Sequence, residues 1–291
     1  MKIALVVALV VLAAFAQAQA QTPLERGKYL VEVLGACGNC HTPKGPQGDL
    51  PDKILAGGFV IEEEFGKAIT SNITPDKETG IGNWTDAEII RASREGKGKD
   101  GKTFGPPMPY YLYRRLSDND VKAIVAYLRT VKPIKNQVPR SQYKIPLPPS
   151  YGPPVTSVPD PPKTNLVKYG EYLAGPVAHC AECHTPQNPP GRPDQSKFFA
   201  GGFPFPGPYG TSYSANLTPD KETGIGNWTD EQLIRAINGV SVSGRPLLPP
   251  MPWPYYAGKI ADADMKAIVA YLRSLKPIKN KVPAPRPPKR P

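Results

Sequence analysis

Each half of the chain contains three segments in which apolar residues recur at the three- and four-residue spacing of an amphipathic helix. In the first segment Leu30, Val31 and Leu34 share one face. No stretch of useful length alternates apolar and polar residues as a half-buried strand does. The pattern therefore predicts an all-α fold. The predicted helices begin at residues 25, 85 and 117 of the first half, and at residues 168, 229 and 262 of the second.

The start of the middle helix is marked in both halves. Thr85 is followed three residues later by Glu88, and Thr229 by Gln232. This spacing predicts a capping box, in which the two side chains satisfy the free backbone N–H groups of the first turn.

Gly27 and Gly170 occupy matching places in the first helix of each half. A glycine inside a helix costs stability, so its presence needs a reason. We expect another helix to cross closely at each of these positions.

The two halves are copies of one plan. The segment NITPDKETGIGNWTD at residues 72–86 returns as NLTPDKETGIGNWTD at residues 216–230, and KAIVAYLR at residues 122–129 returns unchanged at residues 266–273. Repeats of this length indicate a duplicated domain rather than a solenoid of short units.

Residues 1–20 have the pattern of a secretory signal peptide. Lys2 precedes fourteen consecutive apolar residues, and small residues then offer two cleavage sites. The apolar run is shorter than the roughly 20 residues of a membrane span. We expect export and cleavage, with retention as an uncleaved anchor as the alternative.

Proline-rich stretches divide the remainder of the chain. Ten prolines fall within residues 133–162, which predicts a stiff, extended connector. From Lys276 onward there are six basic residues, six prolines and no acidic residue, so we expect the last residues to be disordered or draped on a surface. The predicted organisation is a signal peptide (1–20), a first domain (21–140), a linker (141–162), a second domain (163–281) and a basic tail (282–291).

Composition adds two constraints. The chain of 291 residues is 40% hydrophobic and contains 38 prolines and 27 glycines, so each small domain has a lean core that a bound apolar group would complete. The formal net charge of +11 favours an acidic partner or an anionic surface. No nucleic-acid-binding motif accompanies this charge, so we expect no nucleic-acid partner.

The candidate chemistry lies in two short motifs. The sequence CGNCH at residues 37–41 returns as CAECH at residues 180–184. Such a motif attaches a c-type haem: the two thiols add to the vinyl groups, and the histidine binds the iron. A zinc half-site or a redox dithiol would leave both histidine positions unexplained. The predicted residues are Cys37, Cys40, Cys180 and Cys183 for two covalent haem c groups, with His41 and His184 as axial ligands.

Two methionines are candidates for the opposite axial position. Met108 and Met251 each lie 67 residues beyond a motif histidine, in the frame Pro-Pro-Met-Pro. The prolines hold the loop extended and so present the thioether at low ordering cost. The alternative is that each methionine fills a core gap. Met265 lies on a predicted helix and is expected in the core.

Seven further residues have less specific patterns. Trp84 and Trp228 precede the middle helices, where they would contact a haem or pack in the core; Arg91 and Arg235 would pair with propionates or lie on a solvated helix face. Tyr110 corresponds roughly to Tyr255. His179 has no counterpart. It would be a second iron ligand, a proton-linked group or a surface residue, and we interpret it as a surface residue.

The order of these motifs resembles that of the multi-haem cytochrome c subunits of bacterial periplasmic dehydrogenases for alcohols, aldehydes and gluconate. The resemblance covers nearly all of the chain after residue 20. It implies two tandem class I cytochrome c-like domains, each wrapped around one covalent haem. Family members usually carry three haem domains, whereas this chain has two motifs.

The resemblance also implies a function. The chain would be a non-catalytic, periplasmic electron carrier that accepts electrons from a dehydrogenase subunit and passes them to quinone, a cytochrome or an oxidase, with peripheral membrane association. Two alternatives remain open. One is a haem enzyme such as a di-haem peroxidase or a thiosulfate-oxidising cytochrome, which needs an open iron. The other is a linker subunit whose basic tail docks a partner.

Overall fold

The computed structural model describes residues 21–188, 192–207 and 210–286. The expected signal peptide and residues 287–291 of the expected tail lie outside this part of the chain. Among the described residues, no helix combines the length and the apolar character that a membrane crossing requires.

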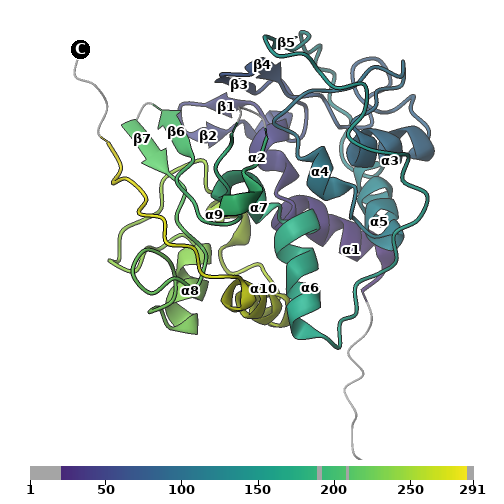
Figure 1. Ribbon diagram of the computed structural model, residues 1–291. Helices are drawn as coiled ribbons and strands as arrows, with labels where there is room; N and C mark the ends of the chain where they lie inside the picture. Colours follow the sequence, from purple (N-terminus) through teal and green to yellow (C-terminus); the bar gives the residue numbers. More distant parts are fainter. Residues whose placement is uncertain (1–20, 189–191, 208–209, 287–291) are drawn as a thin grey trace, which may run out of the picture.

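The helices, the short helical turns and one hairpin of four-residue strands follow the same order in both halves, whereas the strands β1, β2 and β5 are named only in the first half (Figure 1). The first half contains α1 (Pro23–Tyr29), a π-helical turn η1 (Leu30–Leu34), α2 (Cys37–His41), β1 (Lys44–Gly45), β2 (Gly48–Asp49), a 3-10 turn η2 (Pro51–Lys53), β3 (Val60–Glu63), β4 (Gly66–Ile69), α3 (Asp86–Glu95), α4 (Tyr110–Tyr113), α5 (Asp118–Leu128) and β5 (Gln142–Tyr143). The second contains α6 (Leu166–Tyr172), a π-helical turn η3 (Leu173–Val177), α7 (Cys180–His184), a 3-10 turn η4 (Gln195–Lys197), β6 (Pro204–Gly207), β7 (Gly210–Tyr213), α8 (Asp230–Ile237), α9 (Trp253–Tyr256) and α10 (Asp262–Ser274).

The three predicted helices of each half are present, but the all-α expectation is not confirmed. Short antiparallel hairpins pair β1 with β2, β3 with β4, and β6 with β7. These strands are two to four residues long. Strands this short give no alternating pattern, so the hydrophobic periodicity did not reveal them.

The glycine prediction is confirmed in both halves. Helix α1 crosses α5, and α6 crosses α10. A Cβ atom added at Gly27 would lie 2.0 Å from the carbonyl oxygen of Ala123, and one added at Gly170 would lie 1.8 Å from that of Ala267. The backbones touch at each crossing, so only glycine fits there.

Both capping boxes also form as predicted. Thr85 and Glu88 bond each other's backbone N–H at the start of α3, and Thr229 and Gln232 do the same at the start of α8. Met265 is 6% exposed and lies in the core, as expected.

The expected linker begins as part of the first half. Residues Gln142 and Tyr143 pair with β4 to make a third strand beside β3 and β4. Farther along, the Tyr151 hydroxyl donates to the Phe104 carbonyl at 2.8 Å. The tail repeats this arrangement, because Arg286 forms an antiparallel bridge with Thr211 of β7. The domain boundaries given above remain a prediction.

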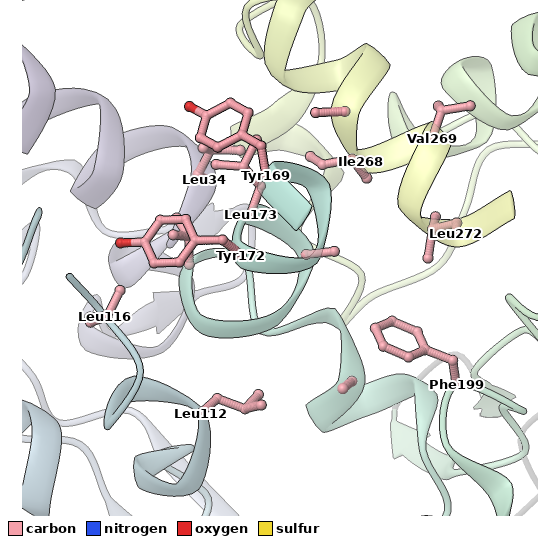
Figure 2. Close-up of a cluster of buried hydrophobic side chains, with 14 of the residues drawn as sticks. Leu34, Leu112, Leu116, Tyr169, Tyr172, Leu173, Phe199, Ile268, Val269 and Leu272 are labelled. Carbon is pink, nitrogen blue, oxygen red and sulfur yellow. The ribbon is translucent and has the colours of Figure 1, made fainter. Parts of the chain in front are cut away.

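The largest hydrophobic cluster spans both halves. Figure 2 shows Leu34, Leu112 and Leu116 of the first half beside Tyr172 and Leu173 of the second. Apolar burial is the main favourable contribution to folding. A shared cluster therefore joins the two halves into one body.

Candidate haem-binding sites

The two motifs form matching five-residue helices, α2 and α7. Each follows a residue in the left-handed region, Ala36 with φ 43° and His179 with φ 41°. Left-handed backbone is unusual for a residue other than glycine, so its repetition indicates a defined local geometry. In each half the two cysteines and the histidine lie on one helical turn.

The orientation of each motif histidine is set by one hydrogen bond. His41 Nδ1 lies 2.7 Å from the Ser71 carbonyl oxygen, and His184 Nδ1 lies 2.8 Å from that of Ala215. A carbonyl only accepts, so Nδ1 is the donor and Nε2 keeps its lone pair. Burial lowers the pKa of both imidazoles, which keeps them neutral. A neutral imidazole with one nitrogen bonded to a carbonyl is the usual form of a metal-ligating histidine.

These two carbonyls were not identified from the sequence. Ser71 and Ala215 each directly precede the start of the long internal repeat, at Asn72 and Asn216. The repeat was therefore the available signal, although a backbone acceptor leaves no side-chain pattern of its own.

The threonine after each motif histidine is buried and bonds to a later segment of the chain that packs against the motif. Thr42 is fully buried, and its hydroxyl accepts the N–H of Leu55 at 3.1 Å. Leu55 has a φ of 62°, which turns the chain back toward the motif. The Gly57 N–H then donates to the His41 carbonyl at 2.7 Å. The second half repeats this arrangement with Thr185, Phe199, Gly201 and His184.

The cysteines have the character of neutral thiols. All four are unpaired. Burial raises the pKa of Cys37, Cys40 and Cys180 to about 12, and it also raises the pKa of Cys183. Zinc requires thiolates, and within residues 21–188, 192–207 and 210–286 no group of three or more His, Cys, Asp or Glu side chains could hold a metal ion. Unpaired cysteines followed directly by a histidine are the groups that covalent haem attachment uses.

The two methionines lie in matching but differently covered loops. Met108 and Met251 are half-buried and precede α4 and α9. In the first loop Tyr143 packs over Gly105, where an added Cβ would lie 2.4 Å from the ring, and donates to the Pro106 carbonyl at 2.9 Å. The matching position in the second loop is Leu248, which is 41% exposed.

The remaining sequence candidates have structural partners. Trp84 and Trp228 pack against the two hydrophobic clusters, and Arg91 donates to the Gly98 carbonyl at 3.0 Å. Arg235 makes the matching contact with Val242. Tyr110 corresponds to Trp253 rather than Tyr255, because these two rings face the matching Gly96 and Gly239.

His179 is not a surface residue, which corrects the sequence interpretation. Its side chain is 18% exposed and lies where the two halves meet. Burial lowers the pKa of His179, but the Glu182 carboxylate at 2.8 Å and the Gly35 carbonyl outweigh this effect and raise it overall.

A sequence model of the family described as cytochrome c matches residues 24–132 and 168–276. The chain belongs to the cytochrome c family. Each matched region contains one CxxCH motif, so the chain has two cytochrome c domains, and it carries two covalent haem c groups.

Relatives of this cytochrome include subunits of dehydrogenases. It is 35% identical over 269 residues to the fructose dehydrogenase cytochrome subunit of Gluconobacter japonicus, covering 87% of this chain and 52% of that protein. It is 31% identical over 286 residues to the cytochrome c subunit of the quinone alcohol dehydrogenase of Gluconobacter oxydans, covering 90% and 57%. It is 30% identical over 201 residues to a diheme cytochrome c-type protein of Cereibacter sphaeroides, covering 64% of each.

The resemblance to dehydrogenase cytochrome subunits is thereby confirmed. The chain spans about half the length of the first two of these relatives.

Proposed function

We propose that this protein is a di-haem electron carrier, a non-catalytic subunit that accepts electrons from a dehydrogenase and passes them to the respiratory chain. The observation that carries the proposal is the matched pair of histidines, each with Nδ1 bonded to a carbonyl and Nε2 left available. Two equivalent sites fit two carriers of the same kind. An enzyme would favour two unlike sites.

The chain's own residues would hold each haem on both faces. Cys37 and Cys40 would form thioether bonds, His41 would provide the proximal nitrogen, and Met108 the opposite sulfur. In the second domain the corresponding residues are Cys180, Cys183, His184 and Met251. The haem supplies a one-electron redox change, and methionine–histidine ligation raises its reduction potential. Each domain is then a class I cytochrome c domain.

The partners follow from the relatives and the charge. Several relatives are cytochrome subunits of dehydrogenases, which supports a dehydrogenase as donor. Quinone, another cytochrome or an oxidase would be the acceptor. The excess of basic residues favours an acidic partner or peripheral contact with an anionic membrane. The predicted signal peptide supports the periplasm as the compartment of this exchange.

The test is the ferric absorption spectrum of the mature protein. We expect a long-wavelength methionine-to-iron charge-transfer band equivalent to two haems. Met108→Ala and Met251→Ala should each remove half of it. Met265→Leu is the matched control, because this buried methionine lies outside the proline frame and should leave the band unchanged.

A haem that lacks the band in the wild type and binds added cyanide readily would be open. That result would overturn the carrier proposal and favour the enzyme alternative, with peroxide and thiosulfate as the substrates to test.

A further inference from the structure

His179 joins the two haem-attachment helices. It is the residue immediately before Cys180 and caps α7. Its Nε2 lies 3.2 Å from the carbonyl oxygen of Gly35, two residues before Cys37 and α2. One side chain therefore connects the segments that begin both motifs.

The imidazole is held from three sides. Nε2 faces the Gly35 carbonyl, Nδ1 lies 2.8 Å from the Glu182 carboxylate, and the Tyr113 ring of the first domain meets it edge-on at 5.7 Å between centroids. Both nitrogens face oxygen atoms of neighbouring residues, so these contacts hold the ring in one orientation.

The segments it joins already approach closely. An atom added at the Cβ position of Gly35 would lie 3.7 Å from the carbonyl of Val177 in the second domain. Burial is the main cause that raises the pKa of Cys40, and the negative charge of Glu182 is the second. Glu182 belongs to the second motif and Cys40 to the first, so the two motifs lie within electrostatic range of each other. The two attachment sites are neighbours across the domain interface.

The contact has no counterpart in the first domain. Ala36 occupies the position that matches His179, with nearly the same left-handed backbone. Its methyl group has no hydrogen-bonding capacity. The histidine is thus not required to form the motif turn and serves the interface instead.

We propose that His179 is a positioning residue that fixes the second haem site against the first and so sets the rate of electron exchange between the two domains. This inference rests on the carrier function proposed above. Electron exchange between two haems falls steeply with their separation, so a residue that fixes the separation also fixes the rate.

The test uses the mature holoprotein and two readouts. Pulsed EPR of the ferric form measures the distance distribution between the two irons, and flash photoreduction measures electron exchange between them. In His179→Ala we expect a broader distance distribution and slower electron exchange than in the wild type. His179→Gln, which keeps a donor toward Gly35, should recover most of both.

Arg115→Ala is the matched control. Arg115 forms an exposed ion pair with Glu171 across the same interface, at 2.7 Å. It should change neither readout. An unchanged distance distribution and exchange rate in His179→Ala would overturn the proposal, whereas loss of the methionine band would contradict the carrier function instead.

Discussion

At the scale of single residues, partly buried hydrogen bonds hold the two motifs in place. Asn136 donates to the carbonyls of Ala56 and Gly57, and Asn280 does the same at Ala200 and Gly201. These asparagines end the repeated KPIKN segment, so a residue far along the chain closes the turn beside the motif. These backbone carbonyls need hydrogen-bond donors, and the asparagine side chains supply them, which explains why the asparagine is repeated in both halves.

Thr42→Val tests this support. The change keeps the shape of a fully buried side chain but leaves the N–H of Leu55 without its acceptor. An unsatisfied buried donor costs about 1–3 kcal/mol, so we expect the free energy of unfolding in urea to fall by that amount. Thr130→Val, at an exposed position, should change it by less than about 0.5 kcal/mol. Equal effects of the two changes would rule out a special role for Thr42.

At the scale of elements, Gly27 permits the close crossing of α1 over α5, because a side chain at this position would collide with the backbone of α5. The sequence predicted both helices, both capping boxes and the close approach at Gly27, because each follows from local pattern. It did not predict the π-helical ending of the first helix at Leu30–Leu34. A π turn differs from an α turn by one hydrogen-bond register, which the side-chain spacing of five residues does not distinguish.

Gly27→Ala tests the crossing. The added methyl group would meet the Ala123 carbonyl at 2.0 Å and the Tyr127 Cβ at 2.9 Å, so α1 has to move away from α5. Overpacking of this kind costs at least about 1–3 kcal/mol, and thermal unfolding should show the loss. Gly175→Ala is the control, because nothing lies within 4 Å of its added Cβ and the expected change is under about 1 kcal/mol. A Gly27→Ala variant as stable as the control would mean that the helices separate without cost.

At the scale of the whole molecule, the two domains are joined by a reciprocal pair of contacts. The Tyr172 hydroxyl donates to Asp120 of the first domain at 2.7 Å, and the Tyr29 hydroxyl donates to Asp264 of the second at 3.0 Å. Each hydroxyl also accepts the N–H of the residue that caps the other domain's last helix, Ser117 or Ala261. The two tyrosines occupy matching positions, so the interface has approximate twofold symmetry.

This interface is the part that the sequence did not reveal. A proline-rich connector suggested two separate domains, yet the hydrophobic cluster in Figure 2 crosses between them. Asp120 and Asp264 are each 7% exposed, although aspartates usually face solvent. Their partners come from the other domain and from Arg26 and Tyr169, and no local spacing encodes that pairing.

Tyr29→Phe and Tyr172→Phe test whether the reciprocal contacts make one cooperative unit. Each change deprives a buried carboxylate of a donor and should lower the free energy of unfolding by about 1–3 kcal/mol. In the double variant the two domains should unfold separately. The apparent slope of the unfolding free energy against urea concentration should then become shallower, because the single transition is lost. Tyr127→Phe removes a hydroxyl that contacts Glu32 within the first domain, so it should leave one steep transition. If the double variant also keeps that steep transition, the shared apolar cluster alone unites the domains, and the tyrosines orient an interface that would form without them.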